Sequence, residues 1–197
     1  MPKIKVYLSL IPDKKIEKVL PKERFDEING CLDEKVKREK YFVWKLLELA
    51  LRDATGGNPD FMRFYKGVNG KWQTQGVEFS LSHSNGVVAV AISDKPVGIY
   101  LQVIKPLKND RLIEKIFTEK ELEKINALSE QEKTARIIEK WAEKESDFKR
   151  VGGDNFLTYI RDNRAVSGFS ARITLPNGDY VVAVSGEGEV EMKIVEL

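Results

Sequence analysis

Hydrophobic and polar positions follow two periods along the chain, and each period predicts one kind of element. Apolar residues at every second position indicate strands, because successive side chains of a strand point to opposite faces. The run over 87–92 is apolar on both faces, which favours a central strand. Together with short apolar runs, this pattern predicts strands near 3–11, 77–82, 87–92, 97–103, 169–175, 180–184 and 190–195.

Apolar residues that recur every three to four positions predict two long helices. The first is expected over 32–54, because Gly56 follows it as a helix stop. The second is expected from 130 to about 149. Two Ser/Thr and Glu pairs have the capping-box spacing of a helix start: Thr118 with Glu121, and Ser129 with Glu132.

The predicted elements fall into two halves of similar content, which favours an α+β fold. Each half combines one long helix with about three strands in a small, mostly antiparallel sheet. A polar segment with a proline, 105–110, separates them, so we place an N-terminal half at 1–104 and a C-terminal half at 105–197. We expect one compact unit with a cleft between the halves. The similarity of 179–184 to 85–90 predicts an internal pseudo-twofold duplication.

Charge balance narrows the classes of partner. The 197 residues include 33 Lys or Arg and 31 Asp or Glu, which gives a formal net charge of +2. This balance argues against a protein that neutralises a long run of nucleic-acid phosphates, so no nucleic-acid partner is expected. It is compatible with a small, local anion site.

Cysteine and histidine are almost absent, which restricts metal and redox chemistry. Cys31 is the only cysteine and His83 the only histidine, so an intramolecular disulfide, a cysteine-based zinc site and a two-histidine site are excluded. Any metal would be held by oxygen atoms, as magnesium is. The sequence has no run of about 20 apolar residues, and we expect a cytoplasmic protein without a membrane role.

Glu145 is the most informative charged position of the second helix. On a helical wheel, Glu145 and Lys149 each lie about 20° from the apolar residue Ile138. A carboxylate on an inward face needs a cation, a metal or donated hydrogen bonds. Two interpretations stay open: a structural ion pair between Glu145 and Lys149, or a functional carboxylate.

The segment 79–86 places small hydroxyl groups where a strand runs into a turn. Alternation puts Ser80, Ser82 and Ser84 on one side of this strand, with His83 between them in sequence. Hydroxyls beside free backbone amides suit a phosphate. A histidine and capping serines at an ordinary turn are the alternative. A Ser-His-acid hydrolase is a weaker interpretation, because no Gly-x-Ser-x-Gly motif accompanies these residues.

Taken in order, the motifs of most of the chain resemble those of the 4′-phosphopantetheinyl transferases, in their larger, monomeric, surfactin-synthetase-activating type. The resemblance implies two similar α+β halves that bind coenzyme A between them. It also implies transfer of the phosphopantetheine arm to a serine of an acyl or peptidyl carrier protein, with release of adenosine 3′,5′-bisphosphate and with magnesium as cofactor. The motifs are Gly70-Lys71, Phe79-Ser80-Leu81-Ser82-His83-Ser84, Val97-Gly98-Ile99-Tyr100-Leu101-Gln102, Phe117-Thr118-Glu119-Lys120-Glu121, and Trp141-Ala142-Glu143-Lys144-Glu145-Ser146 with Lys149.

The same resemblance implies a binding role for five residues. Ser82 and His83 would contact the phosphates of coenzyme A, and Lys71 its adenosine end. Lys149 would contact the pyrophosphate, together with Lys144.

Metal binding and proton transfer are implied for further residues, and here the chain departs from the family. Glu145 would ligate the magnesium ion, and Glu121 would help to deprotonate the carrier serine. Where the family motif is Gly-Ile-Asp-x-Glu, this chain has Tyr100 and Gln102 in place of the two carboxylates. A neutral phenol is a poor ligand for a hard cation, whereas an amide oxygen is tolerable. We therefore expect a weak or lost magnesium site.

Two functions follow from this departure. The first is a phosphopantetheinyl transferase of reduced activity, and the second is a non-catalytic homologue that binds coenzyme A or a carrier protein. Loss of the ion could slow transfer by orders of magnitude. A monomer is expected in both cases, because a duplicated chain builds the cleft inside one molecule.

Overall fold

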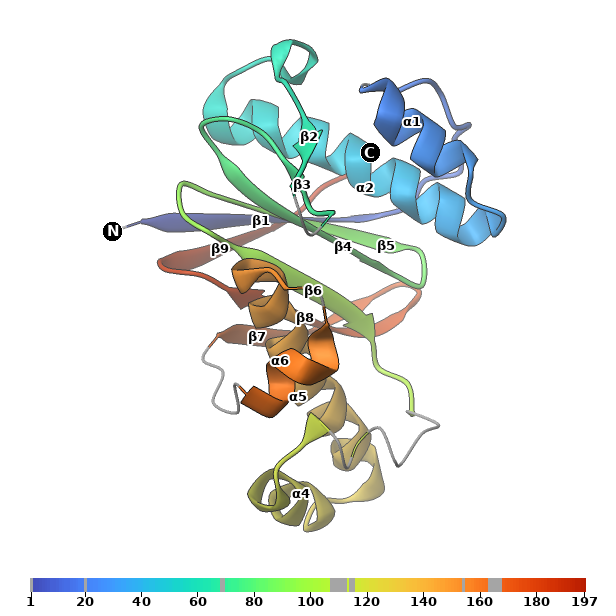
Figure 1. The fold of residues 1–197 in the computed structure, drawn as a ribbon. Coiled ribbons are helices and arrows are strands. Elements are labelled where there is room, and N and C mark those ends of the chain that lie inside the picture. Colours follow the sequence, from blue (N-terminus) through green and yellow to red (C-terminus); the bar gives the residue numbers. More distant parts are fainter. Residues whose placement is uncertain are drawn as a thin grey trace.

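The described residues form two main sheets, each covered by a long helix, and a separate two-stranded sheet, as a computed structural model shows (Figure 1). The structure describes residues 2–19, 21–67, 70–106, 113, 116–153, 155–162 and 168–197, without the side chains of 60, 131, 161 and 162. In chain order the elements are β1 (Lys3–Leu10), α1 (Lys22–Asn29), α2 (Glu34–Thr55), the 3-10 turn η1 (Pro59–Phe61), β2 (Tyr65–Lys66), β3 (Trp72–Gln73), β4 (Glu78–Ser84), β5 (Val87–Ser93), β6 (Gly98–Val103), α4 (Glu119–Asn126), α5 (Glu130–Val151), α6 (Phe156–Asp162), β7 (Phe169–Leu175), β8 (Gly178–Ser185) and β9 (Glu189–Ile194).

This element list confirms the mixed α+β class, the predicted strands and both long helices. Both helices begin at the caps that their sequences provide: Asp33 accepts a hydrogen bond from the amide of Val36, and Ser129 accepts one from Glu132. β5 is buried along its whole length between β4 and β1, as its two apolar faces predict. The helices α1 and α6 and the β2–β3 hairpin were not predicted.

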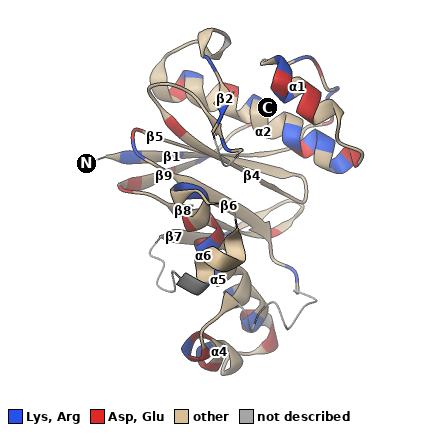
Figure 2. Ribbon diagram, viewed as in Figure 1, with Lys and Arg blue, Asp and Glu red and all other residues tan. Residues whose placement is uncertain are grey.

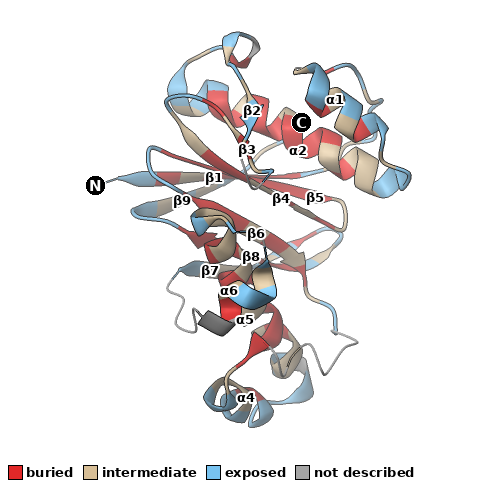
Figure 3. Ribbon diagram, viewed as in Figure 1, coloured by how far each residue is buried: buried red, intermediate tan, exposed pale blue. Residues whose placement is uncertain are grey.

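The elements stack in the order helix, sheet, sheet, helix. α2 covers one face of the sheet β4-β5-β1-β9 and buries its apolar stripe there, as Figure 3 shows. A second apolar cluster joins this sheet to the sheet β6-β8-β7, with Val6 and Ala89 from one and Ile99 and Val182 from the other. α5 covers the outer face of the second sheet, where Ala142 is fully buried.

The two sheets share one order of elements, and β6, which precedes the predicted boundary at 104, belongs to the second of them. In both, a strand, a long helix and a hairpin follow one another, and the second hairpin strand pairs antiparallel with the first strand: β1-α2-β4-β5 and β6-α5-β7-β8. This common order is compatible with the duplication, which stays a prediction. β6 belongs to the second sheet, so the sheets divide near 94–97, whereas β9 returns to pair in parallel with β1.

Charged residues of both signs are mixed along α1, α2 and α4 (Figure 2). No helix in the described ranges is long and apolar enough to cross a membrane. Most of the predicted linker 105–110 lies outside the described residues.

Candidate functional site

A pocket of about 300 Å³ lies where the end of α5 meets β4 and the residues before β3. Lys71 and Lys149, to which the resemblance assigns the adenosine end and the pyrophosphate of coenzyme A, both line it. Trp72 and Phe79 contribute aromatic surface. The pocket therefore combines apolar walls with two cations, which is the composition of a site for an organic anion.

Lys149 is held at this pocket by contacts with two strands, β4 and β6. Its Nζ atom donates a hydrogen bond to the carbonyl of Leu81 at 3.0 Å and lies 5.1 Å from the centre of the Tyr100 ring. The pKa of Lys149 is lowered to about 8, mainly because the ammonium group is buried. The negative charge of Glu145 raises this pKa, and the positive charge of Lys71 lowers it. A backbone carbonyl and a ring thus fix the direction of this ammonium group.

Lys71 lies next to Lys149. Its Nζ atom donates to the carbonyl of Val97 at 3.1 Å and to the carbonyl of Lys149 itself at 3.2 Å. Burial lowers the pKa of Lys71, whereas the charge of Glu78 raises it. Two cations at one pocket repel each other, and an anion between them would relieve that repulsion.

The predicted metal ligands also come together, because Tyr100 and Gln102 lie on the β6 face that α5 covers. The Tyr100 hydroxyl accepts a hydrogen bond from Trp141 Nε1 at 3.3 Å and donates one to Gln102 Oε1 at 3.4 Å. Burial raises the pKa of Tyr100 to about 12, and the negative charge of Glu145 contributes. Burial likewise raises the pKa of Glu145, while Lys149 opposes this effect.

These donors do not fit a magnesium ion. In the described part of the chain, no three carboxylate, histidine or cysteine side chains gather in a way that could hold a metal. Glu145 is the one carboxylate of the predicted set; Tyr100 is a neutral phenol, and the Gln102 carbonyl accepts from that phenol. Magnesium prefers six oxygen ligands in octahedral geometry and usually one or two carboxylates.

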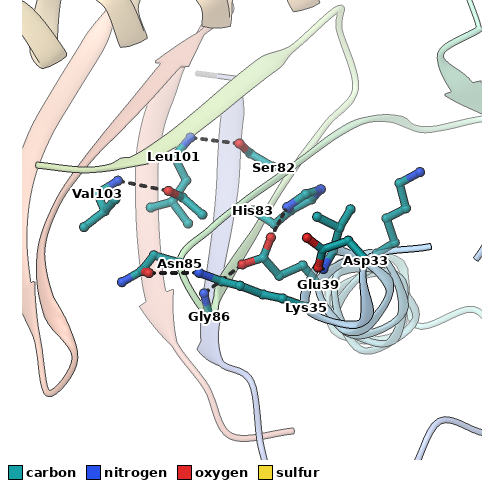
Figure 4. A network of polar contacts seen from close by, with 12 residues as sticks. Asp33, Lys35, Glu39, Ser82, His83, Asn85, Gly86, Leu101 and Val103 are labelled. Carbon is teal, nitrogen blue, oxygen red and sulfur yellow. Dashed lines mark hydrogen bonds and ion pairs between the residues drawn. The ribbon is translucent and has the colours of Figure 1, made fainter. Parts of the chain in front are cut away.

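The serines of β4 do not surround a free turn, as the sequence suggested; they face β6. Their hydroxyls accept hydrogen bonds from alternate amides of that strand, as Figure 4 shows for Ser82 and Leu101, and all three serines are buried. Between the edge strands β4 and β6, serine hydroxyls therefore take the place of the backbone carbonyls that would accept these hydrogen bonds within a sheet. The pairs are Ile99 N to Ser80 Oγ at 3.1 Å, Leu101 N to Ser82 Oγ at 2.9 Å, and Val103 N to Ser84 Oγ at 3.1 Å.

His83 points to the opposite face of β4, toward α2, where it meets a carboxylate that sequence analysis missed. His83 Nδ1 lies 2.8 Å from Glu39 Oε2, and Glu39 Oε1 accepts a hydrogen bond from the amide of Gly86 at 2.9 Å (Figure 4). Burial raises the pKa of Glu39, but the hydrogen bonds from His83 and Gly86 outweigh it and leave the pKa below its ordinary value. Glu39 thereby fixes the orientation of the imidazole ring. The position of Glu39 one helical turn before Val43, on the apolar face of α2, is the sequence feature that could have identified this carboxylate as buried.

Glu121 and Lys144 pair with each other at the start of α4. Lys144 is buried, and its Nζ atom lies 3.3 Å from Glu121 Oε1. Glu121 Oε2 accepts from the amide of Thr118 at 2.9 Å, which confirms the capping box. Neither side chain is among those that line the pocket at Lys149.

Comparison with known proteins gives a partial relationship to an enzyme. No protein-family model matches the chain. A 4′-phosphopantetheinyl transferase of Bacillus subtilis is 29% identical to it over 108 residues, which is 52% of this chain and 46% of that protein. The chain thus matches about half the length of this curated relative. The match supports a relationship at the level of that superfamily.

Proposed function

We propose that the protein binds coenzyme A at the pocket of Lys71 and Lys149 and transfers its phosphopantetheine arm to a serine of an acyl or peptidyl carrier protein. The observation that carries this proposal is the meeting of two lysines from distant motifs at one pocket with aromatic walls. The partial match to a phosphopantetheinyl transferase supports the same reaction class.

Binding would use the cations for the phosphates and the apolar walls for the organic parts of the ligand. Lys149 would donate to phosphate oxygens, since an ammonium group carries three donors and its contact with the carbonyl of Leu81 uses one. Lys71 would add a second positive charge beside it. Trp72 and Phe79 would contribute apolar wall to the part of the pocket that holds the organic portion of the ligand. His83, oriented by Glu39, would present its second ring nitrogen to a further phosphate.

The transfer step is a displacement at phosphorus. The serine oxygen of the carrier forms a bond to the phosphorus that bears the pantetheine arm, the bridging P–O bond breaks, and adenosine 3′,5′-bisphosphate leaves. The serine proton goes to a base. Glu121 would fill this role through Oε1, which contacts Lys144 and keeps a second lone pair, because the capping bonds use Oε2.

Mass spectrometry of an apo carrier protein tests this proposal. The carrier is incubated with the protein and coenzyme A, in parallel with magnesium and with a chelator. A gain of the phosphopantetheine mass in either reaction supports the transferase. Absence of both transfer and coenzyme A binding would contradict the proposal.

The second function, a non-catalytic homologue, is favoured by Tyr100 and Gln102 at the positions of two expected carboxylates. It predicts binding of coenzyme A by calorimetry without any change of the carrier's mass. The two measurements together separate the two functions.

A further inference from the structure

We infer that this site binds the diphosphate of coenzyme A without a divalent cation, because the ammonium group of Lys149 supplies the positive charge that the resemblance expects from magnesium. This inference rests on the proposed function and names how its ligand is held. The side chains that are present do not fit the expected magnesium ion.

Two of the three predicted metal ligands are uncharged side chains. Tyr100 replaces a carboxylate by a larger neutral ring, and its hydroxyl is engaged with Trp141 and Gln102. The Gln102 oxygen accepts from that hydroxyl and also belongs to an uncharged group. One carboxylate, Glu145, is left to attract a cation, and Lys149 lies one helical turn away from it.

Lys149 is positioned by the Tyr100 ring and by a backbone carbonyl of β4. Its Nζ atom lies over the Tyr100 ring, 5.1 Å from the ring centre, and donates to the carbonyl of Leu81. A cation over an aromatic face is attracted by the ring quadrupole, so Tyr100 favours the ammonium group on this side of β6. Tyr100 therefore weakens a metal site and stabilises an organic cation at the same place.

The charges of the side chains at this site favour an anion over a cation. Glu145 carries one negative charge when ionised, and Lys71 and Lys149 carry one positive charge each when protonated. A divalent cation would enter against two ammonium groups, whereas a diphosphate is attracted by both. The side chains thus favour the anion and oppose the metal.

Calorimetry of the full chain with coenzyme A, in a chelator and in magnesium, tests the inference. We expect dissociation constants that agree within about threefold between the two buffers. Lys149→Met should weaken binding by about tenfold or more in both. Lys133→Met, a lysine paired with Glu130 on the same helix, is the matched control and should leave the affinity unchanged.

Rebuilding the carboxylates gives the converse experiment. The double variant Tyr100→Asp with Gln102→Glu should bind coenzyme A more tightly in magnesium than in chelator, by about tenfold, whereas Tyr100→Phe should show no such difference. Circular dichroism confirms that each variant is folded before titration.

The possible failures are distinguishable. Wild-type binding that strengthens by about tenfold or more with magnesium would overturn cation-independent binding and leave the proposed function in place. Unchanged affinity of folded Lys149→Met would also overturn it. No binding of coenzyme A in either buffer would overturn the proposed function and this inference together.

Discussion

At the scale of single residues, Glu39 shows how a buried carboxylate is kept in its charged form between α2 and the β4–β5 turn. Two donors reach it from one side, the imidazole of His83 and the amide of Gly86. Asn85, with φ of 49°, gives this turn the left-handed backbone that directs the Gly86 amide toward Glu39. The carboxylate is therefore structural, and its charge matters for stability.

We expect Glu39→Gln to lower the free energy of unfolding by about 1–3 kcal/mol at neutral pH, because charge-assisted hydrogen bonds become neutral ones. The pKa of Glu39 lies below its ordinary value in the folded state, so its contribution is present above about pH 4 and is lost as pH falls through the folded pKa. Urea denaturation across pH measures this. Equal stability differences between wild type and variant at neutral and strongly acidic pH would contradict the assignment.

Residue contacts within regular elements were predictable, and contacts between distant elements were not. The helical wheel placed Glu145 beside Lys149, and strand alternation placed Tyr100 beside Gln102, because both elements keep their periods. The pairing of His83 with Glu39 spans 44 positions of sequence and depends on how α2 crosses β4. Neither period contains that information.

At the scale of elements, the edges of two sheets meet without a ladder of backbone hydrogen bonds. The amides of Ile99, Leu101 and Val103 donate to serine hydroxyls of β4. The alternation of serines is visible in the sequence and suggested a phosphate site. The alternation of one strand does not reveal which other strand its side chains face. A buried amide needs an acceptor, and the neighbouring edge supplies one from side chains.

Ser82→Ala should destabilise the protein by about 1–3 kcal/mol, because it leaves the buried amide of Leu101 without an acceptor. Ser9→Ala is a matched control: Ser9 is equally buried, but its hydroxyl donates to the neighbouring carbonyl of Leu10, so no buried amide loses its acceptor. Its cost should be smaller. Chemical denaturation of the two variants gives the comparison, and equal losses would contradict the role of the serines.

Gly98 lies where the backbones of α5 and β6 approach each other closely. A Cβ atom added there would lie 1.9 Å from the carbonyl oxygen of Ser146 and 2.6 Å from the amide nitrogen of Arg150, both backbone atoms of the helix. This clash gives a packing reason for the glycine that precedes Ile99 and Tyr100 in the motif.

We expect Gly98→Ala to push α5 away from β6 and to cost about 3 kcal/mol or more in stability, at the upper end of overpacking effects. Gly30→Ala is the control, because its Cβ would lie 3.3 Å from the nearest atom, the Asp26 carbonyl oxygen. Thermal unfolding with calorimetry reports both. A Gly98→Ala variant as stable as the control would show that the helix can shift at little cost.

At the scale of the whole molecule, strand exchange links the two ends of the chain. β6 follows the strands β1, β4 and β5 of the first sheet in sequence but is the first strand of the second sheet. β9 follows the strands of the second sheet but pairs with β1 at the edge of the first. Sequence analysis found the strands but divided them at residue 104, because a polar segment was the only boundary signal. Which strand pairs with which is decided by packing across layers, since any apolar strand has the period to join either sheet.

Removal of residues 189–197 tests whether this return closes the fold. The truncation deletes β9, whose Val190 and Met192 pack against the cluster shared by the sheets, and leaves the edge of β1 open. We expect a loss of about 2–4 kcal/mol, since both side chains are partly buried, together with concentration-dependent association through the free edge. Urea denaturation and size-exclusion chromatography measure the two effects.

Glu191→Gln, on the exposed face of β9, is the control and should change stability by less than about 0.5 kcal/mol. The truncated chain could instead unfold at the same urea concentration as the full chain and stay monomeric. That result would show that the pairing of β9 with β1 does not stabilise the fold.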